Sequence, residues 1–200
     1  MMKRSIRRAE KVMVQTNWMK EEIVRTCRIP QDKVEVKFPP VEMLKTAPYH
    51  LDKDKPVFFY PANASAYKNH RTLLKACELL QKKGYKNYQV ILTVTGEENK
   101  GIQALKKDAK EKDLPISFRG AMPRCELFDL YAASVLVFPS YIETIGLPLL
   151  EAKSAGAWIV AADCLYARDM VGDYKRASFF PALDAKKLSH QMQRFCRNEK

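Results

Sequence analysis

Two carboxylates, Glu143 and Glu151, stand with seven residues between them in the segment 139–157, PSYIETIGLPLLEAKSAGA. Pro148 predicts the first turn of a helix, where its missing N–H is not needed. Such a helix start presents free N–H groups and a positive dipole end, which suits a diphosphate, and Gly146 before it lets the backbone approach a ligand closely. A carboxylate accepts two hydroxyl hydrogen bonds at once, so both glutamates could bind the hydroxyls of a ribose or a sugar.

Alternatives to this chemistry are limited by what the sequence lacks. Glu151 could instead be an acidic residue that only complements the helix dipole. No G-x-G-x-x-G or G-x-x-x-x-G-K motif is present, which argues against the usual nicotinamide, flavin and P-loop sites. The histidines are isolated from one another, so each is expected at the surface or as a cap: His50, His70 and His190. The five cysteines are far apart without a C-x-x-C pair, which predicts reduced thiols and no zinc site.

The net charge of +12 could indicate a nucleic-acid partner, but it is spread along the chain. Residues 1–53, 54–118 and 119–200 carry net charges of +5, +5 and +2, with no stripe of basic and aromatic residues. The densest basic cluster suits an acidic membrane surface or a phosphate-rich ligand, or is simply a solvated helix face: Lys3, Arg4, Arg7 and Arg8. We therefore expect no nucleic-acid partner.

Short apolar runs alternate with helical periodicity along most of the chain. The runs predict strands over residues 57–60, 90–95, 116–118, 135–138 and 158–161. The periodic stretches predict helices over residues 71–83, 101–112, 126–134, 148–155, 167–171 and 184–197. This order predicts an α/β fold, a Rossmann-like parallel sheet flanked by helices, with ligands at the carboxyl ends of the strands.

The first fifty residues have a different pattern. A strand over residues 11–15, a helix over 17–27 capped by Thr16 or Asn17, and a strand over 33–38 form one βαβ piece. The proline-rich stretch 40–56 then indicates a linker. We predict three parts: 1–40 as the end segment of a preceding domain, 41–52 as a linker, and 53–200 as a domain. No secretory signal or membrane-spanning run is expected.

The segment around Glu143 and Glu151 resembles the E-x7-E motif of the group 1 (family 4) glycosyltransferases, which are retaining enzymes with the GT-B fold. Other stretches resemble the same family. They are the interdomain segment (16–27 with 34–40), the phosphate-binding lysine loop YKNH (67–70), the strand end near the base (118–120), the buried strand before the motif (131–140) and residues 162–171. The resemblance implies the C-terminal, nucleotide-sugar-binding half of a GT-B enzyme plus the last segment of its N-terminal, acceptor domain.

The resemblance also implies a role for each matching residue. Glu143 would contact the transferred sugar, Lys68 would neutralise the diphosphate, and Glu151 would bind the ribose hydroxyls. The remaining donor-binding positions are Thr144, Ile145, Gly146 and Leu147 through their backbone, and Arg119, Gly120 and Leu127 around the base. Asn63 stands where the family often has an arginine phosphate clamp, Ile145 replaces a more usual aromatic residue, and Asp169 stands where glutamate is commoner.

The implied function is transfer of a sugar from a nucleotide-diphosphate sugar to an acceptor with retention of configuration, in cell-surface polysaccharide or glycolipid synthesis. The nucleotide sugar is a substrate, and no cofactor or metal is expected. The expected partner is the missing N-terminal acceptor domain or a partner subunit, without which these 200 residues are expected to be inactive. The expected location is cytoplasmic, with peripheral membrane contact through a lipid-linked acceptor. The alternative is a non-catalytic nucleotide-sugar-binding or partner-subunit module.

Overall fold

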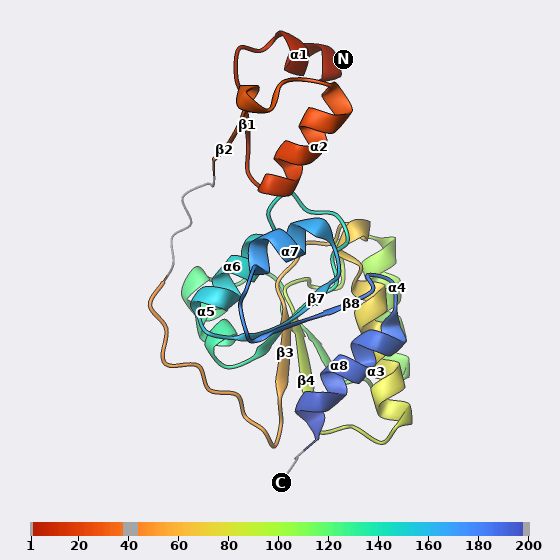
Figure 1. Cartoon of the computed structure of the whole chain (residues 1–200). Coiled ribbons are helices and arrows are strands. Elements are labelled where there is room, and N and C mark those ends of the chain that lie inside the picture. The colour runs from red at the N-terminus through yellow and green to blue at the C-terminus, as the bar shows by residue number, and fades with distance from the viewer. Residues whose placement is uncertain (1, 38–43, 198–200) are drawn as a thin grey trace.

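A six-stranded parallel sheet forms the centre of the molecule. The computed structural model describes residues 2–37 and 44–197 (Figure 1). The strand order is β5-β4-β3-β6-β7-β8, and every neighbouring pair is parallel. The strands are β3 (Val57–Tyr60), β4 (Gln89–Leu92), β5 (Ile116–Phe118), β6 (Val135–Phe138), β7 (Trp158–Ala162) and β8 (Ala177–Phe180). The predicted α/β fold with a parallel sheet is confirmed.

A helix follows each strand. These helices are α3 (His70–Lys82), α4 (Lys100–Glu111), α5 (Arg124–Ala132), α6 (Leu147–Ser154), α7 (Leu165–Val171) and α8 (Ala185–Cys196). Helix α3 packs against α4 and α8, whereas α6 packs against α5 and α7, so two helical layers enclose the sheet (Figure 1). Strands β3 and β6 are neighbours in the sheet, but the helices that follow them, α3 and α6, cover opposite faces.

The two central strands have no polar face. Phe58, Phe59 and Tyr60 of β3 are each 0% exposed, and all of β6 is buried. The ring of Tyr60 meets the ring of Phe138 edge to face, with 5.7 Å between centroids. Such continuous apolar runs are expected where helices cover both faces of a parallel sheet.

Residues 2–37 form a small unit of their own. Its elements are α1 (Met2–Arg8), β1 (Val12–Val14), α2 (Asn17–Cys27) and β2 (Val34–Val36). Strands β1 and β2 pair in parallel, and a separate small core lies between them and α2. Thr16, one of the two predicted caps, accepts a hydrogen bond from the backbone N–H of Met19.

One carboxylate joins this unit to the main domain. Asp169 of α7 accepts hydrogen bonds from the backbone N–H groups of Asn17 (2.8 Å) and Trp18 (3.3 Å) at the start of α2. These N–H groups have no partner within their own helix, so the main domain completes the cap of α2. The domain boundaries stay a prediction, and part of the predicted linker, 41–43, lies outside the described residues.

Strands β4 and β8 show the clearest differences from the sequence-based expectation. Strand β4 ends at Leu92 rather than residue 95, because Thr93 turns its hydroxyl to the backbone N–H of Ala62 (2.9 Å). Strand β8 was not predicted, because its sequence ASFF neither alternates nor forms a long apolar run, and it lies at the sheet edge. Within the described part of the chain, no helix is long and apolar enough to cross a bilayer.

Candidate functional site

The predicted site residues gather at the carboxyl edge of the sheet, where β3 and β6 lie side by side. Phe58 pairs with Val135 and Phe59 with Leu136, so both strands end at the same edge. Because α3 and α6 leave this edge toward opposite faces, the loops after β3 and β6 border the crevice in which parallel α/β sheets bind ligands. The loop after β3 contains Lys68, and the loop after β6 contains Glu143.

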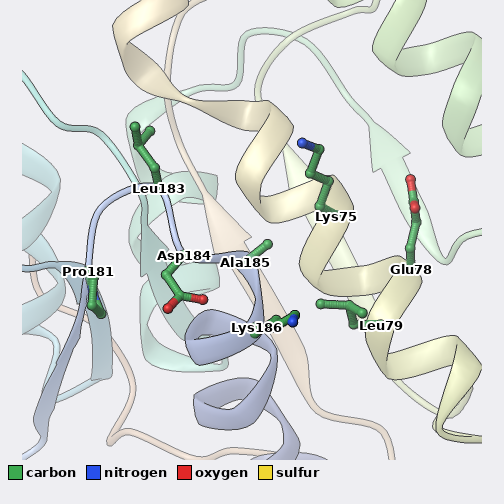
Figure 2. Close-up of a pocket in the computed structure, with 8 residues that line it drawn as sticks. All are labelled: Lys75, Glu78, Leu79, Pro181, Leu183, Asp184, Ala185 and Lys186. Carbon is green, nitrogen blue, oxygen red and sulfur yellow. The ribbon is translucent and has the colours of Figure 1, made fainter.

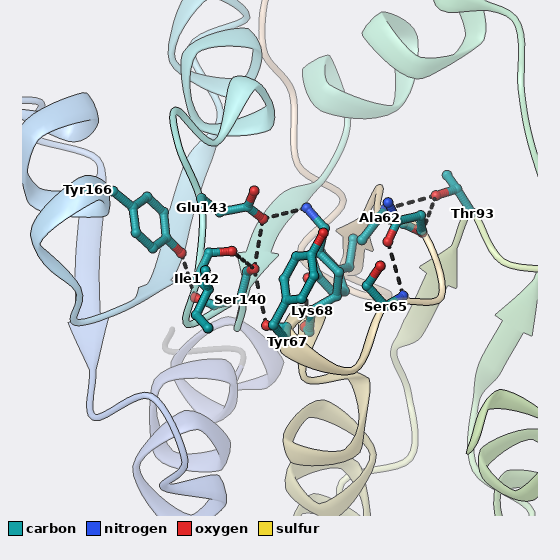
Figure 3. Close-up of polar contacts among 11 residues, drawn as sticks. Ala62, Ser65, Tyr67, Lys68, Thr93, Ser140, Ile142, Glu143 and Tyr166 are labelled. Carbon is teal, nitrogen blue, oxygen red and sulfur yellow. Dashed lines mark hydrogen bonds and ion pairs between the residues drawn. The ribbon is translucent and has the colours of Figure 1, made fainter. Parts of the chain in front are cut away.

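Lys68 and Glu143 form an ion pair in this crevice (Figure 3). Their side chains are only 13% and 12% exposed, although the residues are 75 positions apart. The Glu143 carboxylate also accepts a hydrogen bond of 2.7 Å from the Ser140 hydroxyl. Tyr166 of α7 in turn donates its phenol proton to the Ser140 carbonyl. Ser140 and Tyr166 were not predicted as site residues, and they hold the Glu143 loop in place.

Hydrogen bonds to backbone carbonyls also fasten the two loops together. The backbone N–H of Tyr141 donates to the carbonyl of Tyr67 at 3.1 Å. The amide of Asn69 donates to the carbonyl of Pro139 at 3.0 Å. Asn63, at the predicted clamp position, is exposed, and its side-chain oxygen accepts from the backbone N–H of Ser65. The Asn63 side chain therefore shapes the loop.

The start of α6 carries no side-chain cap. Gly146 is the N-cap residue, with φ +72°, and Pro148 lies in the first turn. A Cβ at Gly146 would stand 3.2 Å from Leu149 Cδ1 and 3.3 Å from Tyr166 Cε2. The fold itself therefore requires glycine here, through its positive φ and its packing, in addition to any approach of a ligand.

The other residues of the α6 loop divide between core and solvent. The Ile145 side chain is 5% exposed and belongs to the main hydrophobic core, so only its backbone can face a ligand. Thr144 is exposed and Leu147 is 41% exposed. This division is compatible with the predicted backbone contacts from residues 144–147, which remain a prediction.

Glu151 lies in the second turn of α6 and is buried, with 7% exposure. Its Oε2 accepts from the Tyr131 hydroxyl at 2.8 Å, and its Oε1 from Arg124 Nη1 at 3.2 Å. Burial and the charge of Glu151 raise the pKa of Tyr131 well above its ordinary value, so the phenol keeps its proton and donates it. Sequence reasoning missed both partners, although their spacing of seven places them on one face of α5.

The predicted base-pocket residues follow β5. Arg119 Nη2 pairs with Glu126 Oε1 at 3.0 Å, and both side chains are partly exposed. Gly120 has φ +74°, and its N–H donates to the carbonyl of Val94. Leu127 is partly buried against the core. Strand β5 is separated from β6 by β4 and β3, whereas Leu127 lies on α5, which packs against α6.

His70 is neither at the surface nor an N-cap residue, contrary to the prediction. It is the first residue of α3, is 4% exposed, and its ring centroid lies 5.0 Å from that of Tyr60. Burial, together with the charge of Lys68, lowers the pKa of His70 to about 4. The imidazole is therefore neutral at physiological pH and adds no positive charge beside Lys68.

Helices α3 and α6 both begin at this edge without a side-chain cap. The N-cap residue of α3, Asn69, makes no side-chain hydrogen bond to a backbone N–H of the helix, because its Oδ1 accepts from the Thr72 hydroxyl at 2.8 Å. Its Nδ2 donates to the carbonyls of Pro139 and Ala182. In the part of the chain that the structure describes, both helices thus begin without a side-chain cap on their first N–H groups, an arrangement that suits an anion. Among the residues described, no group of three or more His, Cys, Asp or Glu is placed to hold a metal ion.

A pocket lies outside this site, between α3 and the start of α8 (Figure 2). Its volume is about 690 Å³, and it is lined by Lys75, Glu78, Leu79, Pro181, Leu183, Asp184, Ala185 and Lys186. None of these is a predicted site residue. Asp184 caps α8 by accepting from the backbone N–H of Lys187, so its position is explained by the helix.

Comparison with known proteins identifies related chains. The family model "Glycosyl transferases group 1" matches residues 44–200. The O-antigen chain mannosyltransferase B of Escherichia coli is 27% identical over 181 residues, covering 84% of this chain and 47% of that protein. The D-inositol 3-phosphate glycosyltransferase of Streptomyces scabiei is 28% identical over 175 residues, covering 78% and 39%. The chain thus spans about half the length, or less, of these curated relatives.

Solved structures share the fold. TarM superposes with a TM-score of 0.81 at 19% identity, covering 98% of this chain and 39% of that one. The sucrose-phosphate synthase of Thermosynechococcus elongatus gives 0.82 at 21% identity, covering 96% and 50%. These likenesses show the predicted GT-B architecture, and the family match covers most of the sequence. The chain belongs to the group 1 glycosyltransferases.

Proposed function

We propose that this chain is the donor-binding part of a retaining glycosyltransferase that uses a nucleotide-diphosphate sugar. The observation that carries the proposal is the cluster of Lys68, Glu143 and Ser140 between the uncapped starts of α3 and α6. A lysine beside two helix N-termini is a strong site for a diphosphate. Such charge matters most as the glycosidic bond breaks, because the leaving nucleoside diphosphate then gains negative charge.

The proposed roles are those that the resemblance implies, and the positions of the side chains are compatible with them. Lys68 and the α6 backbone bind the diphosphate, and Glu143 accepts hydrogen bonds from the transferred sugar. Glu151, one to two turns into α6, accepts from the ribose hydroxyls. We expect no metal cofactor, because Lys68 and the helix starts supply positive charge at the diphosphate.

Glu143 neutralises Lys68 through their ion pair. We infer that a donor exchanges this pair for two new contacts, diphosphate with Lys68 and sugar hydroxyls with Glu143. Nearly buried charges need partners, so the exchange keeps both charges compensated. A nucleotide without its sugar would leave Glu143 without a replacement partner, which favours the complete donor.

The acceptor and the cellular role are further parts of the proposal. One relative is named for an O-antigen chain and the other for D-inositol 3-phosphate, so the names of the relatives point to different acceptors. We propose a role in cell-surface polysaccharide or glycolipid synthesis, in the cytoplasm and at the membrane through a lipid-linked acceptor. The exposed basic side chains of α1 support contact with an anionic surface: Lys3, Arg4, Arg7 and Arg8.

A thermal-shift and calorimetric titration tests the donor assignment. UDP, GDP and ADP are compared with their nucleosides and with single-stranded DNA at physiological salt. We expect one diphosphate to raise the melting temperature clearly and its nucleoside far less. Stabilisation by DNA alone, or by no diphosphate, would refute the proposal. Donor binding without sugar transfer, once the chain is joined to an acceptor domain, would favour the non-catalytic nucleotide-sugar-binding module.

A further inference from the structure

The carboxylate of Glu151 is held at both oxygens by one neighbouring helix. Tyr131 donates to Oε2 at 2.8 Å and Arg124 to Oε1 at 3.2 Å. Arg124 begins α5 and Tyr131 lies two turns later, so both side chains reach Glu151 from the same face of that helix. The plane of the carboxylate is therefore set by α5 rather than by α6, on which Glu151 lies.

The arginine is itself fixed in place. Its Cζ lies 5.4 Å from the centre of the Phe128 ring, one turn along α5. Phe128 packs edge to face against Tyr131, with 5.8 Å between centroids. The Arg124 side chain is 47% exposed, whereas that of Glu151 is 9% exposed, so the guanidinium lies at the rim and the carboxylate beneath it.

The Glu151 carboxylate has enough unused acceptor positions to bind both hydroxyls of a diol. An ionised carboxylate has about four acceptor positions, two on each oxygen. Tyr131 occupies one position on Oε2 and Arg124 one on Oε1. Each oxygen can therefore still accept from one hydroxyl, and two vicinal hydroxyls donate two such bonds at matching separation.

We propose that Arg124 is a positioning residue that orients Glu151 to accept both hydroxyls of the ribose 2′,3′-diol. This inference rests on the proposed function, because it concerns the ribose of the same donor. Arginine suits the task better than lysine, since its planar guanidinium holds a carboxylate in a defined orientation, whereas an ammonium acts as a point charge. If Arg124 only stabilised the start of α5, its removal would not alter recognition of the diol.

The test measures preference for the diol rather than affinity alone. The best-binding nucleoside diphosphate is compared with its 2′,3′-dideoxy analogue by calorimetry. The wild-type chain is expected to prefer the ribose form by about tenfold or more, as lost hydrogen bonds to a charged partner imply. Arg124→Ala should lower this preference at least fivefold, to near that of Glu151→Gln, with little change in affinity for the dideoxy form. Arg124→Lys should recover part of it.

A matched control is available on the opposite edge of the sheet. The Cζ of Arg176 also lies 5.4 Å from an aromatic centre, that of Tyr49, and its Nη1 donates to the Gly156 carbonyl. Both Arg176 and Gly156 precede their strands, away from the carboxyl edge. Arg176→Ala should leave the preference for ribose unchanged.

The outcomes separate this inference from the proposed function. If Arg124→Ala keeps the wild-type preference, or loses equal affinity for both ligands, Arg124 does not position Glu151 for the diol. If the wild-type chain binds neither form, the proposed function fails and this inference with it. Circular dichroism and melting curves identify a misfolded variant, in which case Arg124→Lys and Arg124→Gln decide the result by the same preference.

Discussion

Lys68 and Glu143 approach from neighbouring loops and form a nearly buried ion pair across 75 residues of sequence. The pair unites the residue proposed for the diphosphate with the residue proposed for the sugar. Within the pair, each side chain compensates the charge of the other. Any anion that binds Lys68 must therefore compete with Glu143. Substitutions of Lys68 and of Glu143 should for this reason change ligand affinity in different ways.

Lys68→Ala should weaken binding of UDP or GDP far more than binding of the corresponding nucleoside. Loss of a charged hydrogen-bond donor is expected to reduce diphosphate affinity by about 1–3 kcal/mol. Calorimetry on both ligands measures the difference. Lys112→Ala is a suitable control, since Lys112 also forms an ion pair, with Glu78 at 2.7 Å, at the far end of α4. Equal losses for diphosphate and nucleoside would remove Lys68 from the phosphate site.

Glu143→Gln should have opposite effects on two ligands. It removes the negative charge that competes for Lys68 and keeps an oxygen that can accept from Ser140. Affinity for the free nucleoside diphosphate should stay constant or rise. The nucleotide sugar should no longer bind more tightly than the nucleoside diphosphate. The reason is that hydrogen bonds from sugar hydroxyls to a charged acceptor are stronger than those to a neutral amide. A parallel decrease for both ligands would argue against contact between Glu143 and the sugar.

Gly146→Ala should destabilise the protein more than Gly84→Ala. Both glycines have positive φ, +72° and +88°, so an added Cβ costs roughly 1–2 kcal/mol at either position. At Gly84 nothing lies within 4 Å of that Cβ, whereas at Gly146 three side chains crowd it. Crowding in a packed site adds about 1–3 kcal/mol. Urea unfolding of both variants measures the difference, and equal losses would show that packing around Gly146 relaxes freely.

His70 should make the fold sensitive to mild acid. Its pKa is about 4 in the folded protein against an ordinary value of 6.5, chiefly because of burial. The unfolded chain therefore binds the proton more readily, and stability falls as the pH decreases from about 6.5 toward 4. At pH 4.5 the expected loss is about 2–3 kcal/mol relative to neutral pH.

His70→Leu removes this titration, and His190→Leu, at an exposed position, serves as its control. Urea unfolding at pH 7 and pH 4.5 should show a smaller acid-dependent loss for His70→Leu than for the wild type. The His190→Leu variant should behave as the wild type does. An unchanged loss in His70→Leu would mean that other groups cause the acid sensitivity.

Local sequence determined most of the elements and the candidate motif. The runs at residues 57–60 and 135–138 and the periodic stretch after residue 70 predicted strands and a helix within a residue or two. Apolar runs and helical periods depend on neighbours within a few positions, so they can be read without knowledge of the fold. Strand β8 could not be predicted in this way, because an edge strand needs little apolar sequence.

Only the tertiary structure decided which side chains meet. The pairing of Lys68 with Glu143 requires β3 to lie beside β6, and this order arises because the chain crosses back from β5 over the sheet. The hydrogen bonds from Arg124 and Tyr131 to Glu151 require α5 to pack against α6. Such contacts depend on the order of strands and the packing of helices, which join residues far apart along the chain. The burial of His70, and with it the lowered pKa, follows from the same packing.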